Sequence, residues 1–138
     1  MTALTADFNA PRVEGEFRSL PLAAGVKIYA GAMVALNPAT GYVEPFTTAA
    51  GLVAVGRAEF QADNTAGAAG AISVRCRKGV FLWNNSAGAD LIANANIGEP
   101  CYGVDDNTVA LTNGTSTRSQ AGTVFWVDSA TGKVWVEV

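Results

Sequence analysis

The chain is a succession of short apolar runs broken by clusters of Gly, Asn, Asp and Thr. No long stretch places apolar residues at helical spacing, because Gly and Asn interrupt the Ala-rich segments repeatedly. Short apolar runs separated by turn-forming residues are typical of an all-β fold. We therefore expect residues 23–138 to form a single β domain, a small jelly-roll-like sandwich or barrel. The strand pattern leaves sandwich and barrel open, because it does not encode strand order.

Nine segments have the length and apolar content of strands. They are residues 26–29, 32–36, 42–44, 52–58, 71–83, 100–104, 108–112, 123–128 and 133–138. Residues 61–70 and 84–98 are expected to be loops, the second with room for one helical turn.

Nearly the same turn sequence occurs twice, as NPATGYV at residues 37–43 and as DSATGKV at residues 128–134. An apolar run precedes the turn each time, so each copy predicts a β-hairpin. Asn or Asp at the first position can accept hydrogen bonds from amides inside the turn, and the Gly can adopt a left-handed conformation. A third run at residues 98–110 keeps the pattern but turns on Asp-Asp-Asn. The repetition has a structural cause and indicates no catalysis.

Residues 80–83 and 124–127 are apolar at every position, so both faces of these strands need cover. A second sheet or a barrel interior can cover one face, and a loop, the N-terminal segment or another subunit must cover the other. Trp83, Trp126 and Trp135 are therefore candidate protein-interface residues, because aromatic side chains often anchor interfaces. For each tryptophan, a place in the core is the alternative.

Residues 1–22 differ from the rest, with clustered charges and no sustained apolar period. They predict an extended N-terminal arm. Either the arm is a frayed terminus or it becomes ordered against a neighbouring molecule. In the second case Phe8, Pro11, Arg12 and Phe17 are its candidate interface residues.

Charged residues make up 15% of the chain, against about 25% in ordinary soluble domains. A charge-poor surface loses its hydration at little cost, which favours a protein partner. The net charge of −3 argues against nucleic-acid binding. Arg75, Arg77 and Lys78 are the only clustered bases, and on a strand Arg75 and Arg77 would share a solvated or interface face.

The sequence contains no histidine, which excludes serine and cysteine catalysis of the usual His-dependent kind. The glycines of GLVAVG at residues 51–56 have phosphate-loop spacing, but Arg-Ala follows where Lys and Ser or Thr are required. We expect no enzyme, metal or cofactor, and attribute the acids at residues 105 and 106 to turn formation. A calcium site is the alternative there, but the regular alternation and closing Glu of a dedicated calcium loop are missing. A carboxylate-based glycosidase is a remote alternative. Its catalytic pair would have to come from Glu44, Glu59, Asp105, Asp106 and Asp128.

No apolar run is long enough to suggest a membrane span, and the first residues lack the pattern of a signal peptide. We expect synthesis in a cytoplasm and no membrane partner. Cys76 and Cys101 should then stay reduced and behave as small buried apolar residues, and a disulfide between them is the alternative.

A series of motifs, in this order, resembles the capsid cement, or decoration, proteins of tailed bacteriophages. The series is AAGVKIYAGAMVALN (23–37), TGYVEP (40–45), VGRAEFQADN (55–64), GVF (79–81), NSAGADLI (85–92), IGEPCYGVDDNTVA (97–110), GTSTRSQAG (114–122) and a final VD and GKVWV. The resemblance implies a non-enzymatic virion protein made in the bacterial host. It would bind the outer capsid surface as a homodimer or homotrimer and bridge major capsid proteins. The alternative is a β-rich carbohydrate-binding or adhesin module of a phage particle.

Overall fold

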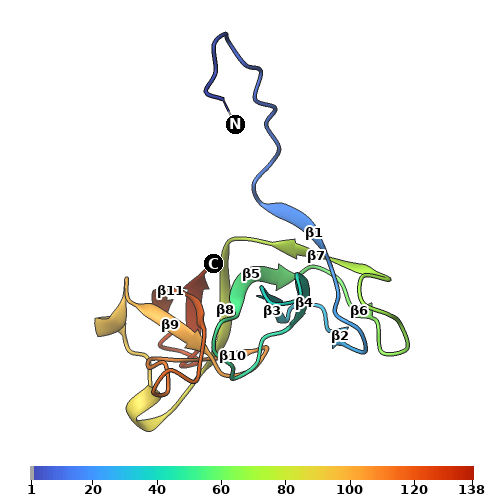
Figure 1. The fold of residues 1–138 in the computed structure, drawn as a ribbon. Coiled ribbons are helices and arrows are strands. Elements are labelled where there is room, and N and C mark those ends of the chain that lie inside the picture. The colour runs from blue at the N-terminus through green and yellow to red at the C-terminus, as the bar shows by residue number, and fades with distance from the viewer. Residues whose placement is uncertain (1) are drawn as a thin grey trace.

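The computed structural model describes residues 2–138, which form short strands and two single-turn 3₁₀ helices (Figure 1). The elements are β1 (Phe17–Pro21), β2 (Lys27–Ile28), β3 (Met33–Asn37), β4 (Tyr42–Pro45), β5 (Val53–Ala58), β6 (Ala62–Asp63), β7 (Ser73–Arg77), β8 (Val80–Asn85), η1 (Gly88–Asp90), η2 (Asn94–Asn96), β9 (Pro100–Gly103), β10 (Thr108–Ala110), β11 (Gln120–Val127) and β12 (Val134–Glu137). The all-β prediction is confirmed.

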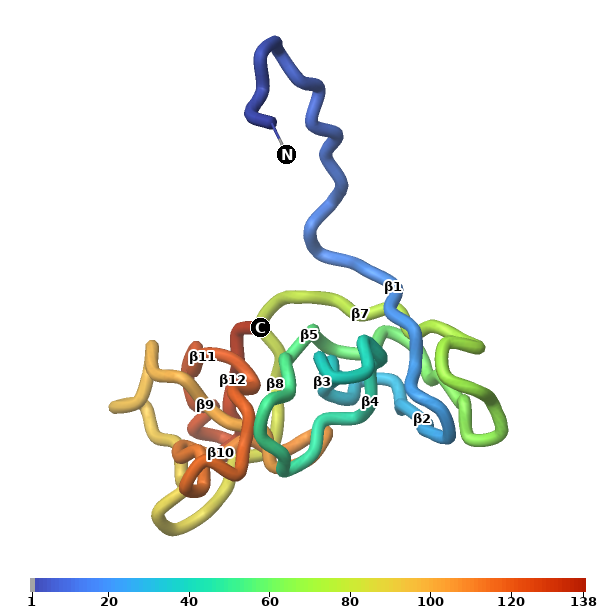
Figure 2. Tube along the Cα trace, in the orientation of Figure 1, coloured from blue at the N-terminus to red at the C-terminus, as the bar shows by residue number. Residues whose placement is uncertain are grey.

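The strands form two main assemblies. A five-stranded sheet has the order β1-β7-β5-β3-β4, and five more strands close into a barrel in the order β10-β8-β12-β11-β9. Beyond the end of β1, Leu22 makes a parallel bridge to Val43 of β4, which brings the two edges of the sheet together. β2 and β6 pair separately. The chain passes from the sheet to the barrel through β7 and β8 (Figure 2).

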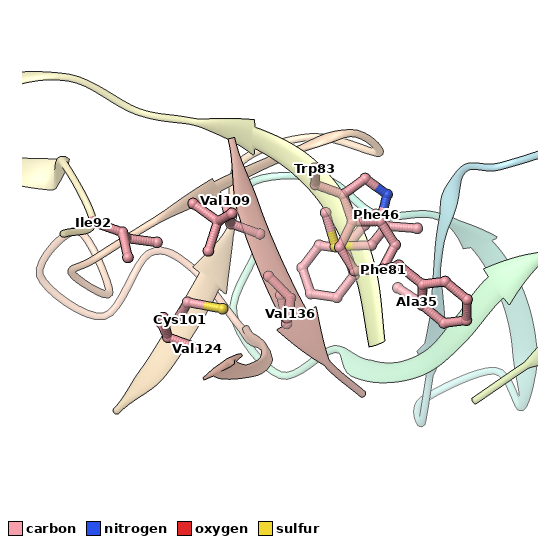
Figure 3. Close-up of a cluster of buried hydrophobic side chains, with 12 residues drawn as sticks. Ala35, Phe46, Phe81, Trp83, Ile92, Cys101, Val109, Val124 and Val136 are labelled. Carbon is pink, nitrogen blue, oxygen red and sulfur yellow. The ribbon is translucent and has the colours of Figure 1, made fainter. Parts of the chain in front are cut away.

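Strand β3 lies between two hydrophobic cores and contributes side chains to both. Met33 and Ala35 belong to the core of the barrel, whereas Val34 belongs to the core of the sheet. The alternation of side chains along a strand explains this division. All three side chains are buried. Burial of both faces of β3 explains why consecutive residues of this strand are apolar. Phe46, just after β4, also enters the barrel core (Figure 3).

The repeated turn forms the same hairpin twice. Asn37 Oδ1 accepts a hydrogen bond from the Ala39 amide at 3.0 Å, and Asp128 Oδ1 accepts one from the Ala130 amide at 3.0 Å. The hairpins join β3 to β4 and β11 to β12. The third predicted hairpin pairs β9 with β10, and its turn is closed by a hydrogen bond from the Asn107 amide to Asp105 Oδ1. All three hairpin predictions are confirmed.

The expected boundaries need three corrections. Residues 71–83 are two strands, because the chain turns between β7 and β8 on leaving the sheet for the barrel. Two residues of the expected loop 61–70 form β6. The extended arm ends at residue 16 rather than 22, because β1 pairs with β7 along its whole length. Each missed strand pairs with a segment far away in the sequence. Residues 84–98 contain two helical turns, η1 and η2, where one was expected, and the first two residues of this segment belong to β8.

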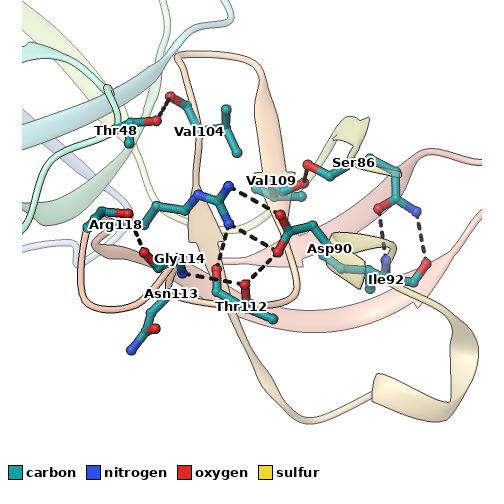
Figure 4. Close-up of polar contacts among 12 residues, drawn as sticks. Thr48, Ser86, Asp90, Ile92, Val104, Val109, Thr112, Asn113, Gly114 and Arg118 are labelled. Atoms are coloured by element: carbon teal, nitrogen blue, oxygen red, sulfur yellow. Dashed lines mark hydrogen bonds and ion pairs between the residues drawn. The ribbon is translucent and has the colours of Figure 1, made fainter. Parts of the chain in front are cut away.

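An ion pair ties together two loops at one end of the barrel (Figure 4). Arg118 donates to both carboxylate oxygens of Asp90, at 3.1 and 3.2 Å, and also to the Thr112 carbonyl at 3.0 Å. The Thr112 hydroxyl donates to the same carboxylate. These hydrogen bonds, first that of Thr112 and then that of Arg118, lower the pKa of Asp90 below its ordinary value of 3.8.

We expect Asp90→Asn to make the protein less stable near neutral pH and to remove part of the acid dependence of its stability. Because the folded state lowers the pKa of Asp90, this carboxylate stabilises the fold above pH 3.8 and ceases to do so as the pH falls through its folded-state value. The difference in melting temperature between the two proteins should therefore shrink as the pH is lowered below 3.8. Thermal unfolding followed by circular dichroism across pH tests this, and a constant difference would contradict it.

Candidate functional site

The arm, defined here as residues 2–16, is exposed along its whole length. Figure 2 shows it leading away from the body of the molecule. The side chain of Phe8 is 69% exposed, and Pro11 and Arg12 are also exposed. Arg12 lies 4.0 Å from Glu14, and both side chains are more than 80% exposed, so this ion pair stabilises little. Three of the predicted interface residues are therefore available for contact with another molecule.

Phe17 is held by its own domain. It begins β1, and its ring is half-buried beneath two guanidinium groups. Arg75 and Arg77 lie 4.2 and 4.8 Å from the ring centroid, so both arginines are on one face of the sheet, as the sequence predicted. Phe17 thus anchors the base of the arm, which leaves less of its surface for a partner.

Trp83 is a core residue, and the prediction that it lies in a protein interface is wrong. Its side chain is only 4% exposed and packs beside Phe81, with ring centroids 5.6 Å apart. Along β8 the side chains of Phe81 and Trp83 point into the barrel, whereas Val80 and Leu82 point outward. The alternation of the strand therefore places this tryptophan inside.

Trp126 and Trp135 lie together on the outer surface of the barrel. Phe125, Trp126 and Trp135 form a group that we call the aromatic cluster, with ring centroids 5.5 and 5.8 Å apart. Phe125 is 45% exposed and Trp126 is 46% exposed, whereas Trp135 is half-buried. These side chains form an apolar surface that no other part of residues 2–138 covers.

A β-bulge creates this cluster. The register of β11 against β12 shifts between Val124 and Trp126, so Phe125 is an extra residue that has no partner opposite. Val124 remains buried, while Phe125 and Trp126 both face outward. Phe125 was not among the interface residues predicted from the sequence. The signal was the unbroken run at residues 124–127, but the bulge that turns Phe125 outward depends on pairing with β12.

A groove with a volume of about 760 Å³ runs between the sheet and the barrel. We call it the basic groove, because four of the nine basic residues of the chain line it. These are Arg57, Arg77, Lys78 and Lys133. Arg57 donates to Glu59 at 2.7 Å and Arg77 donates to Glu16 at 3.1 Å. The sequence indicated only Arg77 and Lys78 of this set, because Arg57 joins them through the pairing of β5 with β7, and Lys133 joins the groove through the packing of the barrel beside the sheet.

An apolar stripe connects the basic groove to the aromatic cluster. Leu82 on β8 is paired with Trp135 on β12, and Trp135 is paired with Trp126 on β11. Leu82 and Trp135 also line the groove. The row of side chains from Leu82 through Trp135 to Trp126 is thus apolar, and its Leu82 end lies in the basic groove.

The two thiols lie in different cores and are not joined by a disulfide. Burial raises the pKa of Cys76 to about 11 and that of Cys101 to about 12. Both thiols are therefore protonated at neutral pH and are poor nucleophiles. The prediction that they are small buried apolar residues is confirmed.

The adjacent residues Asp105 and Asp106 stabilise a turn by accepting hydrogen bonds from backbone amides. Asp105 accepts the amide hydrogen bond that closes the β9–β10 hairpin, and the carbonyl of Asp106 accepts one from the Met33 amide at 2.7 Å. Burial, and then the charge of Asp105, raises the pKa of Asp106. Within residues 2–138, no cluster of three or more His, Cys, Asp or Glu side chains is placed to hold a metal ion.

The arrangement defines an all-β protein whose most prominent surfaces are an arm, an aromatic cluster and a basic groove. No family model, curated protein or solved structure matches the chain. None of the helices in the described part of the chain has the length and apolarity needed to cross a membrane.

Proposed function

We propose that this protein is a capsid cement protein of a tailed bacteriophage. It binds the outer surface of the expanded head, bridges neighbouring major capsid proteins and stabilises the shell. The ordered series of motifs in the sequence supports the choice of a phage capsid. The observation that carries a binding role is the aromatic cluster, an uncovered apolar surface on a charge-poor chain.

The cluster has the chemistry of an interface anchor. Two adjacent aromatic side chains that are each almost half exposed can bury considerable apolar area against a partner without stripping hydrated charges. The bulge fixes both side chains on the surface of a closed barrel, so little conformational freedom is lost on binding. A modest contact suffices, because icosahedral symmetry repeats it many times over one shell.

The geometry of the rings does not favour the carbohydrate-binding alternative. The planes of Phe125 and Trp126 are inclined by 34°, and those of Trp126 and Trp135 by 55°. The three rings therefore do not form one flat platform on which successive sugars could stack.

We expect Phe125→Ala combined with Trp126→Ala to weaken capsid binding at least about tenfold, because truncation of a central aromatic anchor typically costs more than about 1.4 kcal/mol. Co-sedimentation with expanded heads of the phage that encodes the protein measures this. The unchanged protein should saturate the heads at a fixed ratio to major capsid protein. Circular dichroism of the double variant checks that the fold is retained.

Phe60→Ala is the matched control. Phe60 is 65% exposed in the segment after β5, outside the aromatic cluster, so its loss should leave head binding unchanged. Equal loss of binding in the control and in the double variant would remove the aromatic cluster from the interface. No saturable binding of the unchanged protein to the heads would refute the proposed function, and a glycan array would then test the adhesin alternative.

A further inference from the structure

The basic groove holds positive charge that the described part of the chain does not neutralise. Lys78 and Lys133 have no carboxylate within 4.0 Å among residues 2–138. Glu16 is the one carboxylate among the described residues that line the groove, and it is paired with Arg77. In a chain with a net charge of −3, this excess of positive charge along one groove favours an anionic occupant.

The groove also has an apolar side. Val80 and Leu82 point into it from β8, and Trp135 lies beside Leu82 on β12. An occupant that contacts both the lysines and this surface must carry carboxylates and apolar side chains on one segment. An extended acidic peptide satisfies both requirements, whereas a nucleic acid would need a larger basic surface.

The arm of this protein is a segment of that kind. It contains the acids Asp7, Glu14 and Glu16 against the single base Arg12. Its large apolar side chains are Leu4, Phe8 and Val13, with exposed fractions of 72%, 69% and 86%. Apart from the contacts of Glu16, no hydrogen bond or ion pair joins the described part of the arm to its own domain.

The base of the arm favours a contact with another molecule. The Glu16 carbonyl accepts a hydrogen bond from the Lys78 amide at 2.8 Å, which fixes the start of the arm at the edge of its own groove. Figure 2 shows the arm leading away from the body of the molecule beyond this point, so the chain would have to turn back to enter its own groove. When extended, the arm is about 50 Å long, which exceeds the roughly 40 Å diameter of a domain of this size. It can therefore reach a neighbouring copy without a reversal.

We propose that the arm of one copy lies in the basic groove of a second copy. Phe8 and Val13 cover the apolar side of the groove, and the carboxylates of Asp7 and Glu14 neutralise Lys78 and Lys133. Each copy gives one arm and receives one, so the contacts close into a ring of two or three copies. This inference goes beyond the proposed function, because the copies join through their arms whether or not a capsid is present.

Light scattering after size-exclusion chromatography tests the proposal with three proteins. The full chain should have two or three times the 14.2 kDa mass of one copy. A variant that lacks residues 2–14 should be a monomer, because it has no arm to give. The double variant Lys78→Glu with Lys133→Glu should also be a monomer, because its groove repels the arm. Circular dichroism should show that both variants remain folded.

Mixing the two monomeric variants is the decisive step. The truncated chain has an intact groove and the charge-reversed chain has an intact arm, so the mixture should form a one-to-one complex that neither variant forms alone. Lys27→Glu is the control for charge reversal, since Lys27 belongs to β2 and does not line the groove; it should leave the oligomer intact.

Three results would overturn the inference. These are a monomeric full chain, a truncated variant that still oligomerises, and a mixture that does not associate. A monomeric full chain would include the case in which the arm folds back into its own groove. A ring that forms through the arms but does not bind phage heads would leave this inference intact and would refute only the proposed function.

Discussion

Phe46→Ala is expected to lower the free energy of unfolding by about 3–5 kcal/mol, the usual cost of truncating a buried phenylalanine. Phe46 is 1% exposed. It follows β4 of the sheet, yet its side chain belongs to the core of the barrel and its ring lies against Gly103 of β9. Its loss therefore leaves a cavity where the two halves of the molecule meet. Chemical unfolding monitored by tryptophan fluorescence gives the free energy.

Two further substitutions separate the cavity from other effects. Phe46→Leu keeps most of the buried volume and should cost much less than the alanine variant. Phe60→Ala removes the same ring from a position that is 65% exposed, so it should change the stability by no more than about 0.5 kcal/mol. If Phe46→Ala cost no more than Phe60→Ala, Phe46 would not join the two halves.

Gly56→Ala is expected to lower the free energy of unfolding by at least about 2 kcal/mol, because backbone strain and steric overlap each cost about 1–3 kcal/mol. Gly56 has a φ of +126°, which a residue with a Cβ atom rarely adopts. A Cβ atom there would lie 2.3 Å from the carbonyl oxygen of Arg77, and this backbone oxygen cannot move aside without disturbing β7. The glycine thus lets β5 pass close to β7. Thermal and chemical unfolding measure the loss.

Gly98→Ala is the control for Gly56→Ala. Gly98 also has a positive φ, +87°, but a Cβ atom there would have no neighbour within 4 Å. This variant should show the conformational cost without the overlap. Equal losses of stability for the two variants would show that the contact with Arg77 contributes nothing.

The two proposed contacts, of the arm with the basic groove and of the aromatic cluster with the capsid, use different parts of the surface. If the arm of a neighbour occupies the basic groove, Phe125 and Trp126 at the other end of the apolar stripe are still free to face the shell. Loss of the arm would then weaken head binding indirectly, because separate monomers lose the avidity of a ring. Loss of the aromatic cluster would weaken head binding while leaving the ring intact.

The hairpins could be predicted because each is stabilised by residues close in sequence. The hydrogen bonds from the Ala39 amide to Asn37 and from the Ala130 amide to Asp128 each span two residues, so the turn residues identify them. β1 and β6 could not be predicted in this way. β1 exists because it pairs with β7, more than fifty residues away, and nothing in its own apolar pattern indicates that partner.

The same contrast applies to the candidate site. The sequence by itself determined that the chain is charge-poor, lacks histidine and consists of short strands after an extended arm, because these properties depend on composition and local spacing. Only the tertiary structure decided which aromatic residues face outward. Trp83 and Trp126 stand in similar apolar runs, but the alternation of β8 buries the first, whereas the bulge in β11 exposes the second. Likewise, the basic groove exists only because segments far apart in the sequence pack together: the pairing of β5 with β7 sets Arg57 opposite Arg77, and the packing of the barrel beside the sheet adds Lys133 to the same groove.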